Sequence, residues 1–109
     1  MTSAEWIPVI VDRIVERFQP LRVILFGSHA RGQARPDSDV DLLVVLAQCS
    51  NSRAATIAIL RELSDLLAPT DILVTTPEEI ERRGQVIGSV LRPALREGRV
   101  VYEQARPSR

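Results

Sequence analysis

Lysine is absent from this chain, and all 14 of its basic residues are arginines. Any cationic contact to a phosphate group must therefore come from a guanidinium fork. The 14 basic residues are balanced by 14 acidic ones, so the chain has no overall positive charge. Without that field to attract a polyanion, we expect no direct binding of duplex DNA or RNA.

Cysteine, aromatic residues and long apolar runs are also scarce. The single cysteine, Cys49, excludes an internal disulfide and favours a reducing compartment, so we expect a cytoplasmic protein. No apolar run approaches the ~20 residues of a membrane span, and no signal peptide precedes the first expected helix. Trp6, Phe18 and Phe26 are predicted to be core or interface residues and not a platform for stacking bases.

The patterning of the 109 residues predicts an α/β (α+β) fold, with helices packed against a mixed sheet of about four strands. We expect one domain over residues 1–103 and a disordered tail over 104–109. The expected strands are 22–26, 39–46, 71–75 and 99–102. The expected helices are 7–18, 51 or 52 to about 67, one opening at 76–79 and one ending at 97, with a single helical turn at 28–32.

Two of these helices carry further expectations. Thr2 and Glu5 can form a capping box that starts the first helix early, whereas Pro8 argues for a later start. Apolar spacing in the second helix predicts one buried face. That face comprises Ile57, Leu60, Leu63, Ser64 and Leu67.

Two aspartates, Asp39 and Asp41, stand at the start of the apolar run 42–46. In a strand, alternate side chains share a face, with Cα atoms roughly 6.6 Å apart. Like charges on one face repel unless a cation neutralises them, and all-oxygen ligands suit Mg²⁺ or Mn²⁺. A pair of carboxylates at this spacing can share two divalent ions about 3.5–4 Å apart. The sequence therefore predicts a metal site at Asp39 and Asp41 rather than two solvated acids.

An EF-hand calcium loop is excluded, although Asp37, Asp39 and Asp41 imitate its first half. That loop requires glycine at its sixth position and glutamate at its twelfth. Leu42 and Gln48 occupy those two positions here.

A small-residue turn, Gly27-Ser28, precedes the acidic pair. Glycine lets a phosphate approach the backbone, and a serine at a helix start offers its hydroxyl and its N–H. Arg31, one turn later, is placed to reach a phosphate or pyrophosphate group, with a surface ion pair as the competing interpretation. A Walker A motif is absent, because Gln33-Ala34 stands where Lys-Ser/Thr is required.

Asp71 is the candidate third carboxylate. It begins an expected strand that can lie beside the one carrying Asp41, so it can serve either as a metal ligand or as a general base. His29, the sole histidine, is expected to be a solvent-facing loop residue and not a catalytic base.

Gly27-Ser28, ten residues and then Asp39-Val40-Asp41 resemble the signature of the nucleotidyltransferase superfamily with the DNA polymerase beta-like fold. The fuller string, Gly-Ser-His-Ala-Arg-Gly to Asp-Val-Asp-Leu-Leu-Val, is similar to that of its small prokaryotic branch, the minimal nucleotidyltransferases. The resemblance extends through Thr70-Asp71-Ile-Leu-Val to the last expected strand.

The resemblance implies a metal-dependent transfer of AMP from ATP to a hydroxyl group, with release of pyrophosphate. By position it implies that Asp39 and Asp41 bind two Mg²⁺ ions and that Asp71 completes the triad. It also implies that Gly27 and Ser28 hold the triphosphate, and we add Arg31 and Ser38 as candidate phosphate contacts. Many relatives of this kind are encoded beside a HEPN-domain ribonuclease toxin and act as its antitoxin by adenylylating one of its tyrosines.

The expected elements leave no residues for an acceptor-binding domain, so we expect a folded partner protein as acceptor, or completion of the site by oligomerisation. Two alternatives remain open. One is a non-catalytic antitoxin that binds nucleotide and neutralises its partner by occlusion. The other is transfer to a small molecule such as an aminoglycoside.

Overall fold

The structure is a computed structural model that describes residues 2–84, 86, 89 and 91–105. In this part of the chain, four strands form one mixed sheet in the order β3-β2-β1-β4. They are β1 (Arg22–Phe26), β2 (Val40–Val45), β3 (Thr70–Thr75) and β4 (Arg99–Glu103). β1 runs antiparallel to β2 and to β4, whereas β2 and β3 are parallel. The predicted mixed sheet of about four strands is confirmed.

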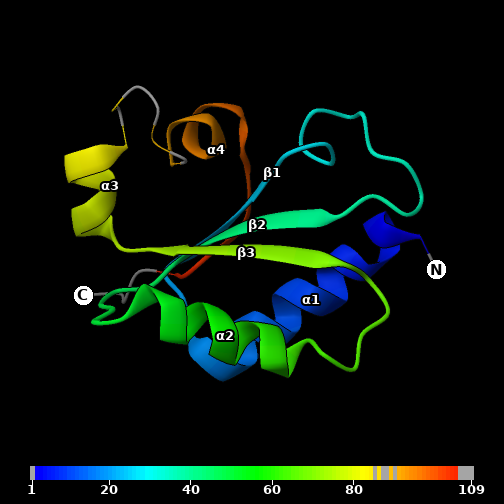
Figure 1. The fold of residues 1–109 in the computed structure, drawn as a ribbon, viewed down its shortest axis with the longest axis horizontal. Coiled ribbons are helices and arrows are strands. Elements are labelled where there is room, and N and C mark those ends of the chain that lie inside the picture. Colours follow the sequence, from blue (N-terminus) through cyan, green and yellow to red (C-terminus); the bar gives the residue numbers. More distant parts are fainter. Residues whose placement is uncertain (1, 85, 87–88, 90, 106–109) are drawn as a thin grey trace.

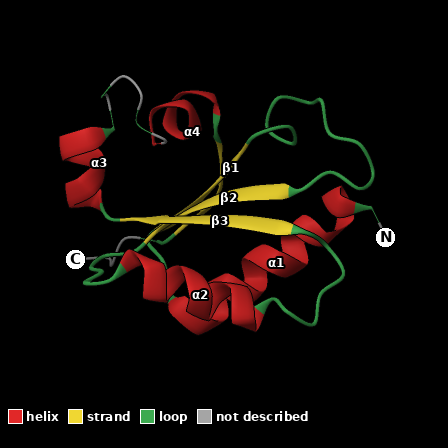
Figure 2. Cartoon of the chain, in the orientation of Figure 1, coloured by secondary structure: helices red, strands yellow, loops and turns green. Residues whose placement is uncertain are grey.

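The helices cover both faces of this sheet. α1 (Ser3–Phe18) and α2 (Ser52–Glu62) lie on one face, and α3 (Pro77–Arg83) and α4 (Leu91–Glu97) lie on the other (Figure 1). Figure 2 shows the resulting three layers, with the strands between the two helical layers. No helix within the described residues is long and apolar enough to cross a membrane.

β2 is buried on both faces. Its successive side chains point to opposite faces of the sheet, and this alternation sets the direction of the side chain of Asp41. Val40, Leu42 and Val44 pack into the core beneath α1 and α2. Leu43 and Val45 point the other way and pack with residues of α4. Because alternate strand residues share a face, Asp41 points toward the layer of α3 and α4.

α1 begins earlier than its apolar spacing suggests. The predicted capping box is present: the Thr2 hydroxyl accepts from the Glu5 amide, and the Glu5 carboxylate accepts from the Thr2 amide. This cap starts the helix at Ser3, the earlier of the two starts that the sequence left open, and Pro8 lies inside the helix. Gln19, in the left-handed conformation at φ 49°, then ends it.

α2 ends at Glu62, earlier than the predicted 67, and its buried face also differs from the prediction. Leu63 is buried as predicted, but Ile59 is buried with it, and Ala55 packs beside them. Ile57 and Leu60 are 45% and 39% exposed, and Leu67, beyond the helix, is 87% exposed. The apolar positions support either of two faces, and contact with β3 selects the one that contains Ile59.

The corrected face leads to a stability prediction. Replacing Ile59 with alanine removes buried methyl groups and leaves a cavity, so the free energy of unfolding should fall by about 2–5 kcal/mol. Ile57→Ala is the matched control, and because this side chain is exposed its effect should stay within about 0.5 kcal/mol. Urea unfolding followed by circular dichroism measures both. Equal losses in the two variants would contradict the assignment of the buried face.

Other boundaries move by a residue or two. β2 begins at Val40 and not at Asp39, β3 at Thr70, and β4 continues to Glu103. The expected helical turn at 28–32 is a hydrogen-bonded turn and not a helix. At the chain end, the Gln104 amide donates to the Leu21 carbonyl at 2.8 Å. Residues 106–109 of the predicted tail lie outside the described residues.

Candidate active site

Asp41 and Asp71 lie side by side at the amino-terminal ends of two parallel strands. The register of β2 against β3 pairs their Cα positions directly. Because the two residues have the same parity in adjacent strands, their side chains emerge on the same face of the sheet. Asp41 is half-buried and Asp71 is exposed. The sheet therefore brings together two carboxyl groups that are separated by 30 positions in the sequence.

Asp39 lies directly before β2, which begins at Val40. Its side chain is exposed, and its charge is close enough to raise the pKa of Asp41. Within the described residues, no three His, Cys, Asp or Glu side chains form a ready-made metal cluster. The acids thus consist of a close pair, Asp41 and Asp71, with Asp39 at its margin.

Gly27 forms the wall beside this pair. Phe26, the last residue of β1, is registered against Asp41, and Gly27 follows with φ at 72°. A Cβ atom built on Gly27 would overlap Asp41 Oδ2. Glycine is therefore required here twice, for the left-handed backbone and for the space that the carboxylate occupies.

The turn that begins at Gly27 is closed by its own backbone. The Arg31 amide donates to the Gly27 carbonyl at 3.1 Å, and the Gln33 amide donates to the Ser28 carbonyl at 2.9 Å. The Arg31 guanidinium donates to Gln33 Oε1 at 3.1 Å and lies 3.7 Å from Glu97 of α4. The competing interpretation of Arg31, a surface ion pair, is thus present, and it links the turn to α4.

Ser38 is used within the loop that leads to β2. Its hydroxyl accepts from the Arg35 amide at 2.7 Å, and its own amide donates to the Arg35 carbonyl at 3.0 Å. The same loop is fixed to the start of α1, where the amide and the hydroxyl of buried Ser3 both donate to the Pro36 carbonyl, at 2.8 and 3.0 Å. These bonds shape the loop that carries Asp39.

His29 lies in the turn between β1 and β2, as predicted, but its side chain is less exposed than that of a fully solvent-facing residue. It is half-buried, its Nε2 lies 3.4 Å from the Ser38 carbonyl, and its charge lowers the pKa of Asp41. His29 is partly buried because the turn that carries it meets the loop at Ser38, a contact that the sequence does not show. Its position directly after Gly27-Ser28 was the signal that pointed to the site.

The pKa of Asp41 is raised above its usual value. Burial is the largest cause, followed by the charge of Asp71, a side-chain hydrogen bond with Asp71 and the charge of Asp39. Like charges and partial burial both disfavour the ionised form. A divalent cation would relieve that repulsion, and carboxylate oxygens are the ligands that Mg²⁺ and Mn²⁺ prefer. The donor set fits such an ion.

This raised pKa leads to a pH prediction for metal-free protein. Between its unfolded and folded pKa values, Asp41 binds more protons in the folded state, so stability falls as pH rises through that window. Asp41→Asn should therefore melt higher than wild type at pH 7.5 in EDTA, with the difference disappearing below about pH 4, near the ordinary aspartate range. Thermal melts across pH measure this. A variant that is less stable at pH 7.5 would contradict the assigned repulsion.

The sequence matches the family model described as nucleotidyltransferase domain over residues 7–101. The chain belongs to the nucleotidyltransferase domain family. This match includes the turn at Gly27, both aspartates of the 39–41 motif and Asp71. Nucleotidyltransferase domains generally use a nucleoside triphosphate and a divalent metal ion, in agreement with the chemistry of the carboxylate pair.

Two solved structures share the fold of this nucleotidyltransferase domain. One is a protein of Sulfolobus solfataricus provisionally assigned as a nucleotidyltransferase, with 21% identity and a TM-score of 0.64 over 92% of this chain and 79% of that chain. The other is a toxin–antitoxin solved with AMP-PNP, with 18% identity and a TM-score of 0.61 over 88% of this chain and 73% of that chain. No curated protein sequence matches the chain.

Proposed function

We propose that this nucleotidyltransferase domain transfers AMP from ATP to a hydroxyl group, most simply a tyrosine, of a partner protein. The observation that carries the proposal is the direct pairing of Asp41 with Asp71 beside the Gly27 turn, in a chain of the nucleotidyltransferase family. The acceptor hydroxyl oxygen forms a bond to the α-phosphorus. The bond from that phosphorus to the bridging oxygen breaks, and pyrophosphate leaves.

The residues of the chain have distinct proposed roles in this transfer. Asp39 and Asp41, with Asp71, would hold Mg²⁺, which supplies charge neutralisation for the phosphates when bound. The alternative role of Asp71, which is exposed, would be to accept the proton of the acceptor hydroxyl. Gly27 and Ser28 would hold the triphosphate. Positioning and charge compensation then supply most of the catalysis.

Arg31 and Ser38 have supporting roles in the proposal. Arg31 is the proposed phosphate contact, and binding the triphosphate would draw it from Glu97, its partner at 3.7 Å. Ser38 is proposed to contact phosphate through its hydroxyl hydrogen. The bond with the Arg35 amide uses only the hydroxyl oxygen, as an acceptor. Since the chain contains no lysine, an arginine is the only long cationic side chain available to the leaving pyrophosphate.

A toxin–antitoxin role is proposed on the same basis. The fold neighbour described as a toxin–antitoxin with AMP-PNP supports a nucleotide-binding antitoxin of this fold. The corresponding partner here would be a HEPN-domain toxin, and the transfer of AMP would inactivate it. Since the proposed acceptor is itself a folded protein, it would bring its own binding surface to the exposed acids.

The deciding experiment is intact-mass spectrometry of the protein encoded beside this chain, after coexpression of the two. The proposal predicts that the neighbour gains the mass of one or more AMP groups, localised to a tyrosine by fragmentation. Coexpression with Asp41→Asn should leave its mass unchanged. If the neighbouring protein is unmodified but its toxicity is nevertheless relieved, the transferase role is wrong. The chain would then neutralise its partner by binding.

A further inference from the structure

The outer side of α2 is an apolar and basic surface that the fold leaves uncovered. Three of the six large apolar side chains that are exposed among the described residues, Ile57, Leu60 and Leu67, belong to α2 and the segment just after it. Ile57 and Leu60 are three positions apart and therefore lie on the same side of the helix. We call Ile57 and Leu60, with their flanking arginines Arg53 and Arg61, the α2 stripe.

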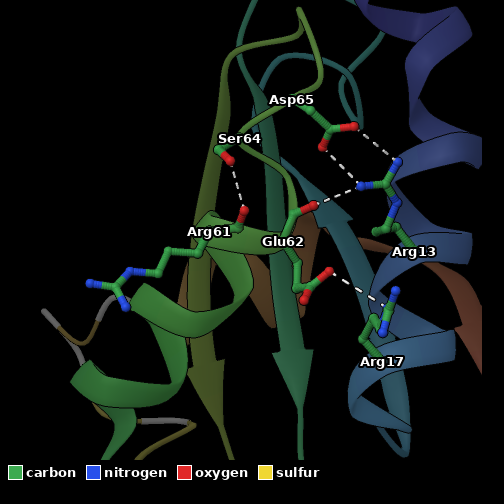
Figure 3. Close-up of polar contacts among 6 residues, drawn as sticks. All are labelled: Arg13, Arg17, Arg61, Glu62, Ser64 and Asp65. Carbon is green, nitrogen blue, oxygen red and sulfur yellow. Dashed lines mark hydrogen bonds and ion pairs between the residues drawn. The ribbon is translucent and has the colours of Figure 1, made fainter.

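The charges around α2 are divided between its two sides. On the side facing α1, both acids are already paired: Asp65 with Arg13 at 2.9 Å and Glu62 with Arg17 at 3.6 Å. Figure 3 shows these contacts, with Arg13 and Arg17 reaching from α1. The same figure shows Arg61 directed away from α1. The inner side of α2 is therefore electrically balanced.

The α2 stripe has no such balance. Arg53 and Arg61 lie four positions before Ile57 and four positions after it, so they border the apolar residues at helical spacing. Among the ion pairs of the described residues, neither arginine has an acidic partner. The surface thus combines exposed apolar side chains with positive charge only.

This composition determines what can cover the stripe. A second copy of the chain would bring arginine against arginine over the same apolar residues, which disfavours self-association. A partner that carries acids beside apolar residues satisfies both the charge and the apolar area. Apolar positions one helical turn apart on a helix accept the matching ridge of another helix.

We infer that the α2 stripe is a docking surface for an amphipathic helix of a partner protein, whose apolar residues are bordered by aspartate or glutamate. The site lies on the face of the sheet opposite the side chain of Asp41, because α2 packs on one face and Asp41 points to the other. A partner held there leaves the acids accessible. The inference does not depend on the proposed reaction.

The test uses a displayed library of helical peptides with fixed apolar positions at i, i+3, i+4 and i+7 and randomised flanking positions, selected on the full chain. The peptides that survive selection should be enriched in Asp and Glu at the randomised flanking positions. The double variant Ile57→Ser with Leu60→Ser should bind the survivors at least ~10-fold more weakly. Selection on Arg53→Glu with Arg61→Glu should instead enrich basic flanks.

The matched control is Arg83→Glu with Val100→Ser, an exposed arginine and an exposed valine on other elements, which should leave binding unchanged. Circular dichroism verifies the folding of each variant. Failure to enrich acidic flanks, or equal binding by the Ile57→Ser and Leu60→Ser variant, would overturn the inference. The inference would also be overturned if the wild-type chain sedimented as a dimer and the Ile57→Ser and Leu60→Ser variant sedimented as a monomer. The occupant of the α2 stripe would then be a second copy of the chain.

Discussion

Asp41→Asn should reduce nucleotidyl transfer by at least ~10²-fold, the loss expected when one transition-state contact is removed from a preorganised site. Asp41 is the half-buried member of the acidic pair, and its burial next to Asp71 and Asp39 raises its pKa. Asparagine keeps the shape but supplies no negative charge for a cation. The measurement is transfer of label from α-³²P-labelled ATP, with Mg²⁺ present, to the protein encoded beside this chain.

Asp37→Asn is the matched control for this experiment. Asp37 is an exposed acid in the loop before β2, four residues from Asp41. Removing its charge changes the net charge of the chain by the same amount without touching the pair. Asp37→Asn should therefore retain wild-type transfer, and Asp39→Asn should fall with Asp41→Asn. Undiminished labelling by Asp41→Asn would remove these acids from the proposed chemistry.

Gly27→Ala is expected to have an effect of similar size by a different route. The added Cβ atom would overlap Asp41 Oδ2. The alanine would also have to adopt the φ of 72° that Gly27 has. The left-handed backbone costs roughly 1–2 kcal/mol for a residue with a side chain. The overlap adds a displacement of the Asp41 carboxylate from its place beside Asp71. Transfer should therefore fall by roughly 10²-fold, since a misplacement of about 1 Å can cost that much.

Gly32→Ala separates the two causes. Gly32 has the same φ of 72°, but a Cβ atom there would meet nothing within 4 Å. This variant should lose the same roughly 1–2 kcal/mol of backbone stability while keeping its activity. Thermal melts and labelling assays on both variants give the comparison. Equal activity losses in the two glycine variants would show that the space beside Asp41 is not what Gly27 provides.

The strands of the sheet, and the position of Asp41 at the start of a buried strand, follow from local sequence. The apolar run after Asp41 predicts a strand buried on both faces, and Leu42, Leu43 and Val44 are fully buried in the structure. The turn residues at Gly27-Ser28 mark the end of β1 for a local reason as well, because glycine supplies the positive φ.

What local sequence does not determine is how elements meet. The apolar residues of α2 support two faces, and only the position of β3 decides that Ile59 is buried and Ile57 is not. The direct register of Asp41 with Asp71 likewise depends on a parallel pairing between strands separated by α2. The partial burial of His29 is a further case, since it reflects the contact between the Gly27 turn and the loop at Ser38.

The parallel register also sets where this chain can change its length during evolution. An extra residue within β2 before Asp41 would turn that carboxylate into the core beneath α1 and Leu42 out of it, because strand side chains alternate. An insertion among the exposed residues 33–35 would only lengthen a surface segment. Divergent homologues should therefore vary in the spacing between the glycine turn and the first aspartate before they vary between the two aspartates.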